Sequence, residues 1–274
     1  MQPTSVEDVR LSCAVLREAK AGSSESEYED AWWAPREPAS AAAGCTVAVA
    51  DGASESMLAG AWAGMLARTV GGLAGRDLDA ALFARLICDT AARWPRYLDR
   101  YTRRREKAGR PVAWYEEPKL ARGAHATLVG VSFRRESGPV YSGGGTWTAA
   151  ALGDSCAFQV RGSRLVEAFP LESAEQFDTA PPLAASRDPD PELIELRTAT
   201  RRGTWLPGDV FYLATDALAQ WFLAQVGAGA RPWREIDEVF DASAELPLWL
   251  GELRTDRRIR NDDVTIVRCR LEPT

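Results

Sequence analysis

The sequence predicts an α+β fold in which layers of strands pack against layers of helices. Short apolar runs with strand composition cluster near the start of the chain, between residues 124 and 169, and near its end. Segments with helical apolar spacing are grouped between those clusters. Strands and helices therefore do not alternate one for one, as they would in a doubly wound parallel sheet. We expect one domain over residues 1–274, a length that can bury one sizeable core.

The N-terminal part begins with a strand pattern at residues 9–16. The polar stretch 20–30 that follows has no apolar periodicity and predicts a loop. A second apolar run, 45–50, predicts a buried strand that ends at Asp51. We expect Ser54 to cap a helix that runs through residue 70, because serine is a favoured N-cap residue and the apolar residues after it have helical spacing.

The middle of the chain changes from a helical to a strand period. Residues 77–101 carry a helix pattern, which Pro95 should kink or break because proline has no N–H to donate. Strand patterns separated by glycine-containing turns follow at 124–133, 146–152, 156–161 and 165–169.

The last hundred residues begin with a stretch rich in Pro, Asp and Ala, 171–192, which predicts a surface loop and a mobile flap beside a cleft. Beyond it we expect a strand at 209–214, a helix from Asp216 to about residue 226, one or two helices over 232–255, and a last strand at 263–271.

Charge and cysteine content narrow the class of protein. The formal net charge of −6 argues against a nucleic-acid binder, which needs excess Lys and Arg to displace counterions, but suits an acidic cluster that binds cations. The apolar stretch 41–50 is too short to span a bilayer, so we expect no membrane partner. None of the five cysteines forms a CxxC pair, and buried reduced thiols in a cytoplasmic protein are the preferred interpretation.

Four aspartates share one local setting, the end of a strand pattern. Asp51, Asp154 and Asp216 each follow a predicted strand, and Asp262 precedes the last one. A carboxylate at the tip of a buried strand is held rigidly and can meet others from neighbouring strands, and hard cations such as Mg²⁺ and Mn²⁺ require oxygen ligands. Each aspartate alone is better explained as a turn or cap residue. Their conjunction favours a metal site.

Six short motifs also follow one another along nearly the whole chain. They are Glu29-Asp30-Ala31, Val49-Ala50-Asp51-Gly52, the strand 123–129 with Ala126-Thr127-Leu128, the turn Gly153-Asp154-Ser155, Gly208-Asp209 followed by Leu213-Ala214-Thr215-Asp216, and Asn261-Asp262-Asp263-Val264-Thr265. In this order and spacing they resemble the PPM family of metal-dependent Ser/Thr protein phosphatases, also called the PP2C family. The chain looks like a divergent, bacterial-type member.

The resemblance implies a four-layer α-β-β-α sandwich, in which two antiparallel sheets pack face to face with helices outside. It also implies a centre of two Mn²⁺ or Mg²⁺ ions in a cleft at one end of the sandwich. Asp51 would bridge the ions and the Gly52 carbonyl would add a ligand, while Asp216 and Asp262 would hold the other ion. A water that such a centre activates would attack the phosphoryl group, with no covalent phosphoenzyme.

Two further roles follow from the same resemblance. Glu29 or Asp30 would contact the metal on the Gly52 side, directly or through water. Asp154 would help Asp216 to hold a third, weaker ion, as in many bacterial members. The implied function is a phosphatase that hydrolyses phosphoserine and phosphothreonine in proteins, with a phosphorylated protein as substrate and a cognate Ser/Thr kinase as a further partner.

Several positions depart from the family pattern. The family carries a phosphate-gripping Arg before the early acidic pair, whereas residues 23–28 contain no Arg or Lys. Ala217 follows Asp216 where the family has Gly, and Asp263 replaces the usual Asn. A phosphatase-like module that binds a partner without turnover therefore stays open as an alternative, as does a hydrolase of small phosphate esters. Arg122 is a candidate for the missing cation.

Two further features are better explained by structure than by function. His125, the only histidine, lies in an apolar strand pattern and is better explained by a packed structural role than by catalysis. The basic run 93–110 is better explained as a solvated helix end than as a docking patch.

Overall fold

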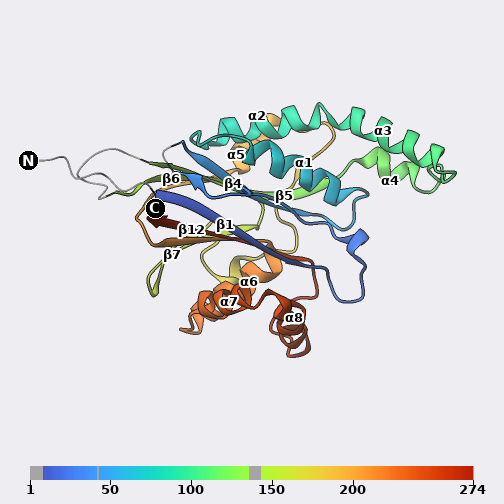
Figure 1. The fold of residues 1–274 in the computed structure, drawn as a ribbon. Helices are drawn as coiled ribbons and strands as arrows, with labels where there is room; N and C mark the ends of the chain where they lie inside the picture. Colours follow the sequence, from blue (N-terminus) through green and yellow to red (C-terminus); the bar gives the residue numbers. More distant parts are fainter. Residues whose placement is uncertain (1–8, 42, 136–142, 274) are drawn as a thin grey trace, which may run out of the picture.

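The computed structural model describes residues 9–41, 43–135 and 143–273. Two antiparallel sheets pack face to face, and helices cover the outer face of each (Figure 1). The predicted four-layer α-β-β-α sandwich is therefore confirmed. Within the described ranges no helix is both long and apolar enough to cross a membrane.

The first sheet is built from both ends of the chain. Its strands, in order across the sheet, are β3 (Ala39–Ser40), β1 (Val9–Glu18), β12 (Val264–Pro273), β11 (Asp209–Ala214), β7 (Cys156–Arg161) and β8 (Arg164–Phe169). Strands β1 and β12 are antiparallel over their full length, with Val9 opposite Pro273 and Glu18 opposite Val264. The C-terminal strand thus lies inside the sheet, between β1 and β11.

The second sheet comes from the middle of the chain. Its strands, in order, are β10 (Ala199–Trp205), β6 (Gly145–Leu152), β5 (His125–Arg135), β4 (Cys45–Gly52) and β2 (Ala31–Trp33), and the two-residue β9 (Ala184–Ala185) also pairs with β5. Strand β4 keeps its pairing with β5 to its last residue, with Asp51 opposite Thr127 and Gly52 opposite Ala126. The predicted aspartate is therefore part of the strand and is as rigid as the sheet.

Alternate strand residues fill the space between the sheets, as the two-residue period of a strand requires. Val47, Val49, Val131, Phe211 and Leu213 belong to this central core. Helices α1 (Ala59–Gly71) and α2 (Ala80–Ala91) cover the outside of the second sheet. Helices α6 (Asp216–Gly227), α7 (Pro232–Asp241) and α8 (Leu246–Thr255) cover the first.

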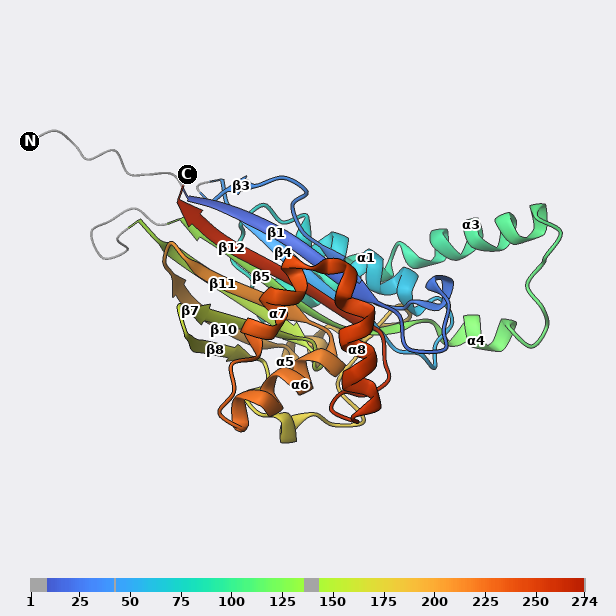
Figure 2. The same cartoon turned by 60° about the horizontal axis from the view of Figure 1, so that its bottom comes forward.

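Two helices leave the body of the sandwich. Helix α3 (Trp94–Lys107) extends away from it, and α4 (Glu117–Arg122) returns towards it (Figures 1 and 2). Pro95 lies in the first turn of α3, where its missing N–H is not needed, so the expected break falls between α2 and α3. We call residues 93–122 the arm.

The helix start predicted at Ser54 is wrong. Helix α1 begins at Ala59, after Leu58, whose φ of 65° marks a tight turn. The Ser56 hydroxyl donates a hydrogen bond to the Ala53 carbonyl at 2.8 Å and accepts one from the backbone N–H of His125 at 3.1 Å. These bonds hold the segment against β5 in a non-helical turn, so the helix starts later.

The segment 171–192 is irregular, as predicted, except at three points. A 3-10 turn forms at Ala174–Gln176, β9 pairs with β5, and Asp190 caps the short helix α5 (Pro191–Arg197). The mobility of this flap stays a prediction. All five cysteines are free, three of them buried and two half-buried.

Candidate metal centre

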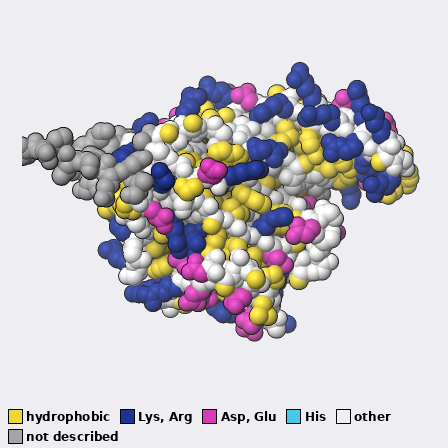
Figure 3. Space-filling model, in the orientation of Figure 1, with side chains coloured by type: hydrophobic (Ala, Val, Ile, Leu, Met, Phe, Trp, Pro, Cys, Tyr) yellow, Lys and Arg dark blue, Asp and Glu magenta, His cyan; other side chains and the backbone are white. Residues whose placement is uncertain are grey.

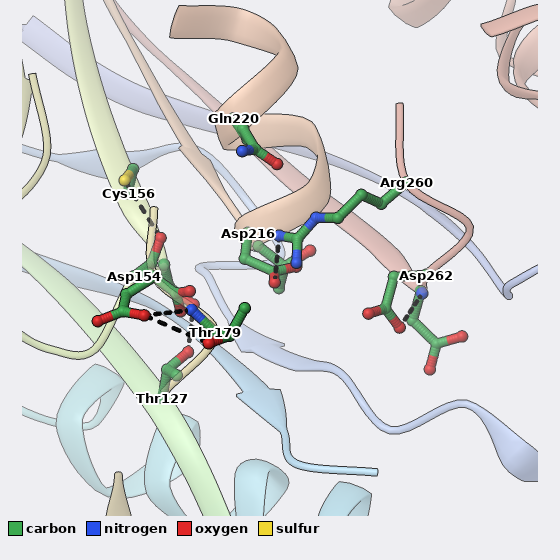
Figure 4. A network of polar contacts seen from close by, with 12 residues as sticks. Thr127, Asp154, Cys156, Thr179, Asp216, Gln220, Arg260 and Asp262 are labelled. Carbon is green, nitrogen blue, oxygen red and sulfur yellow. Dashed lines mark hydrogen bonds and ion pairs between the residues drawn. The ribbon is translucent and has the colours of Figure 1, made fainter. Parts of the chain in front are cut away.

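A pocket of about 610 Å³ contains four of the predicted aspartates in its wall. Asp51 comes from the end of β4, Asp154 from the turn between β6 and β7, Asp216 from the first turn of α6, and Asp262 from the loop before β12. Figure 4 shows three of these side chains around the start of α6. Carboxylates that lie far apart in sequence are thus gathered at one end of the sandwich.

The Asp216 carboxylate has a partner on only one of its two oxygens among the described residues. Its Oδ2 accepts a hydrogen bond from the Arg260 guanidinium at 2.6 Å, which Figure 4 marks. Its Oδ1 is buried and has no hydrogen-bond partner among the described residues. Buried polar atoms are nearly always paired, so this oxygen is free to accept a further cation.

The carboxylates disfavour one another's charge. Burial, and then the charge of Asp216, raises the pKa of Asp154 to about 7. The same two causes raise the pKa of Asp262. Burial raises the pKa of Asp51 well above its ordinary value, and the charges of Asp30 and Asp216 add to that effect. A cation that enters between carboxylates held in this way would therefore stabilise their charged forms.

The early acidic pair lies outside the wall of this pocket. Asp30 is buried, and its Oδ2 accepts hydrogen bonds from Thr215 at 3.0 Å and Thr265 at 2.8 Å, while its Oδ1 has no partner in the described ranges. The Glu29 side chain forms an ion pair with Lys20 at 3.5 Å. A metal contact through either residue stays a prediction.

Gly52 lines the pocket next to Asp51 and cannot be replaced without a shift of the backbone. A Cβ at this position would lie 2.6 Å from the Glu29 carbonyl oxygen and 2.7 Å from the carbonyl carbon of Ala59. The Asp51-Gly52 pair therefore holds the end of β4 against the loop that carries Glu29, and only glycine allows this approach.

Asp263 departs from the family pattern, which has Asn at this position, and its structural role was not predicted from the sequence. One oxygen of its carboxylate accepts the N–H of Lys20 at 2.8 Å and the other accepts the N–H of Glu29 at 2.7 Å. Asparagine has one side-chain oxygen and could not accept both bonds in this way. Asp263 therefore ties the loop 20–29 to the start of β12.

Positively charged side chains also line the pocket, and most of them were not predicted from the sequence. Lys119 and Arg122 of α4 line the wall, together with Arg260 from the loop before β12. The predicted candidate Arg122 is thus in place, although its role stays a prediction. Lys119 and Arg260 belong to none of the sequence motifs. His125, set aside as structural, also lies in the pocket wall.

The residues suit a divalent cation in chemistry, although they do not form a closed coordination sphere. Within residues 9–41, 43–135 and 143–273, no three Asp, Glu, His or Cys side chains lie close enough together to hold one ion. The carboxylates with raised pKa and the unpartnered Oδ1 of Asp216 are what a hard cation would neutralise.

No family model and no curated protein matches the chain by sequence. Solved structures do match in fold. The catalytic domain of the serine threonine protein phosphatase PstP, in complex with two manganese ions, is 15% identical, with 96% of this chain and 99% of that chain covered and a TM-score of 0.54. PppA from Pseudomonas aeruginosa, described as a key regulatory component of T6SS, is 18% identical over 95% and 97%, with a TM-score of 0.54.

A bacterial serine phosphatase shows the same relation at 11% identity, with 96% of this chain and 99% of that chain covered and a TM-score of 0.57. At these identities the likeness concerns the fold. The fold that the resemblance to PPM/PP2C phosphatases implies is confirmed over nearly the whole chain.

Proposed function

We propose that this chain belongs to the PPM/PP2C family and is a Mn²⁺- or Mg²⁺-dependent phosphatase that hydrolyses phosphoserine and phosphothreonine in proteins. The observation that carries the proposal is the convergence of Asp51, Asp154, Asp216 and Asp262 on one pocket. The shared fold with PstP, whose structure contains two manganese ions, supports it.

In this proposal the carboxylates of Asp51, Asp216 and Asp262 and the Gly52 carbonyl would hold two ions. Asp154 would join Asp216 in holding a third, weaker ion, and Glu29 or Asp30 would support the Gly52 side. When bound, such ions supply a water of low pKa as the nucleophile and neutralise charge on the phosphoryl group. The rigid ends of β4 and α6 keep the ligands in position.

Other residues of the pocket would orient the substrate. Lys119 and Arg122 present positive charge from α4, opposite in sign to the aspartates and suited to phosphate oxygens. Residues 178–183 supply Asp178, Thr179 and an apolar strip to the wall, which restricts access of solvent to the bound phosphoester. A phosphorylated protein is then the substrate, and the kinase that produced it is a further partner.

A phosphatase-like module without turnover is the second candidate. The ion pair between Arg260 and Asp216 favours it, because the guanidinium already neutralises one predicted ligand. A hydrolase of small phosphate esters would use the same pocket. Both alternatives predict measurable differences from the first.

The deciding experiment compares hydrolysis of a phosphothreonine peptide and a chromogenic phosphate ester, with Mn²⁺ and after exhaustive chelation. We expect metal-dependent turnover with higher kcat/KM for the peptide. Turnover that survives chelation would remove the metal mechanism. A preference for the ester would favour the small-molecule hydrolase, and metal binding without turnover would favour the binding module.

A further inference from the structure

The arm carries a charge opposite to that of the rest of the chain. Residues 93–122 contain ten Lys and Arg and four Asp and Glu, a net charge of +6. The whole chain is −6, so the remainder carries −12. Figure 3 shows Lys and Arg gathered over α3 and α4, where the arm extends from the body. Such segregation creates a local positive field that an acidic partner would sense.

The basic residues of α3 are arranged as a stripe. Arg96, Arg100, Arg103 and Lys107 are spaced by four, three and four residues, which places them along one face of the helix. Tyr97 and Leu98, by contrast, pack against the core beneath α1 and α2. We call these four cations the basic stripe.

Most of the basic stripe lacks an acidic partner among the residues that the structure describes. Arg103 pairs with Asp99 at 3.0 Å. Arg96, Arg100 and Lys107 have no carboxylate within 4 Å in the part of the chain that the structure describes. Their charges are therefore available to another molecule.

The tip of the arm is ordered and exposes two aromatic rings. Arg105 donates to both oxygens of Glu116 at 2.9 and 3.0 Å and to the Arg110 carbonyl at 2.8 Å, which fixes the turn between α3 and α4. Trp114 is 82% exposed and Tyr115 62% exposed. Exposed rings on a pinned turn lose little conformational entropy on binding, and such rings are typical anchors of protein interfaces.

The arm is continuous with the pocket. Helix α4 begins beside the aromatic tip and ends at the pocket wall, which Lys119 and Arg122 line. A polypeptide whose phosphorylated residue lies in the pocket would therefore reach the arm with its flanking residues. Helix α3 is 14 residues long, or about 21 Å, so an extended segment of roughly six or seven residues matches its length.

We propose that the arm is a docking surface for acidic segments that flank the phosphorylated residue of a protein substrate. The inference rests on the proposed phosphatase function for the identity of the substrate. The basic stripe would pair with Asp and Glu side chains, and Trp114 and Tyr115 would pack against apolar residues beside them. A protein segment is favoured over a nucleic acid because the arm leads to the pocket in which the phosphorylated residue of a protein would lie, and because the net charge of −6 on the whole chain disfavours a long polyanion.

The test uses two fluorescent peptides with one central phosphothreonine, which differ only in Glu or Gln tracts placed about six residues to each side. Binding of their unphosphorylated forms is measured by anisotropy at about 150 mM salt, where charges beyond about 8 Å are screened. The variant Arg96→Glu/Arg100→Glu/Lys107→Glu reverses the stripe. Its matched control, Arg164→Glu/Arg231→Glu/Arg234→Glu, makes the same change in net charge at exposed positions on β8, at the N-cap of α7 and on α7.

The wild-type protein should bind the Glu peptide about tenfold more tightly than the Gln peptide, since several modest surface pairs add. The stripe variant should lose this preference and the control should keep it. Trp114→Ala/Tyr115→Ala should weaken binding of both peptides. Turnover of the chromogenic ester and the melting temperature check that each variant is folded.

Equal binding of the two peptides, or an equal loss of preference in the control, would overturn the proposal. So would a single-stranded oligonucleotide that binds the stripe more tightly than the Glu peptide. Turnover separates the two proposals. A protein that binds the Glu peptide through the stripe but hydrolyses neither phosphopeptide rejects the enzyme and keeps the docking surface. A protein that hydrolyses both phosphopeptides with equal kcat/KM and binds them equally rejects the docking surface alone.

Discussion

The two ends of strand β11 each carry a buried aspartate, and the two are held differently. Asp209, at the start of the strand, accepts hydrogen bonds from Arg161 at 2.7 and 2.8 Å, from the Gln159 amide at 2.8 Å and from the Leu206 N–H at 3.0 Å. Asp216, just after its end, has Arg260 on one oxygen and no hydrogen-bond partner on the other among the described residues.

The difference separates a structural carboxylate from one that is available for chemistry. Both residues have similar burial and the same residue type, so composition and burial do not distinguish them. At Asp209 both oxygens are satisfied by the fold, and another ligand would have to displace those partners. At Asp216 the fold leaves part of the coordination capacity unused, which is costly unless a ligand fills it.

The largest expected effect is the loss of activity in Asp216→Asn and Asp51→Asn. Removing a ligand should cost more than the 10- to 100-fold in metal affinity that outer partners of metal ligands cost, so turnover should fall to background. Removal of a charge also relieves repulsion, so the metal-free variants should melt no lower than metal-free wild type. They should lose the rise in melting temperature on addition of Mn²⁺. A variant with the full rise would show that the residue is not a ligand.

The same substitution at the other end of β11 should act on stability instead. In Asp209→Asn the new NH₂ group faces the donors of Arg161 or Gln159, which leaves a buried donor unsatisfied. We expect a loss of about 3 kcal/mol in the free energy of unfolding, since Arg161 is partly exposed and the full cost of a broken buried pair does not apply. Urea unfolding measures it, and metal binding by the folded fraction should be unchanged. An unchanged midpoint would contradict the structural role.

Arg122→Ala tests the cation that replaces the missing arginine. A charge-assisted hydrogen bond to phosphate contributes about 1.5–3 kcal/mol, so KM for a chromogenic ester should rise by about one to two orders of magnitude. The metal-induced rise in melting temperature should stay as in wild type, because Arg122 is not a ligand. An unchanged KM would clear Arg122 of the role and direct attention to Lys119.

The smallest effect is expected for Arg260→Ala. The guanidinium must leave Asp216 before a metal can use both oxygens, so its removal should raise Mn²⁺ affinity. The pair lies partly in solvent and is worth about 0.2–1 kcal/mol, which corresponds to an increase of about 1.4- to fivefold. Isothermal titration with Mn²⁺ provides the measurement. A decrease in affinity would show that Arg260 helps to assemble the site rather than competing for it.

Much of the fold could be predicted because its strands have clear composition and its turns contain glycine. The strand predictions at 156–161 and 209–214 coincide with β7 and β11. Short strands escaped prediction, since β2, β3 and β9 have three residues or fewer and owe their conformation to the strand beside them. Strand β10 was missed because it is polar and lies at the edge of its sheet.

The site was predictable as far as local sequence marks it. Aspartates at the ends of strand patterns can be identified from local sequence, and four of them line one pocket. Lys119 and Arg260 were not predicted, because they reach the wall through the placement of α4 and the loop before β12 in space. Glu29 and Asp30 were predicted from a motif, and a metal contact through either stays a prediction; the structure adds that Asp30 accepts hydrogen bonds from Thr215 and Thr265. Pairings over such sequence distances are invisible to local patterns.

The position of β12 inside its sheet has a consequence for the timing of synthesis. Strand β1 pairs with β12 residue for residue, and about 250 residues of chain separate the partners. At about 5–20 residues per second, a growing chain contains β1 without β12 for roughly 10–50 s. Asp51 is made early in that interval. Asp262 and Asp263, which ties the loop 20–29 to β12, are made at its end. The acidic pocket therefore cannot be complete before the residues just ahead of β12 are made, and until then the edge of β1 that pairs with β12 has no partner strand.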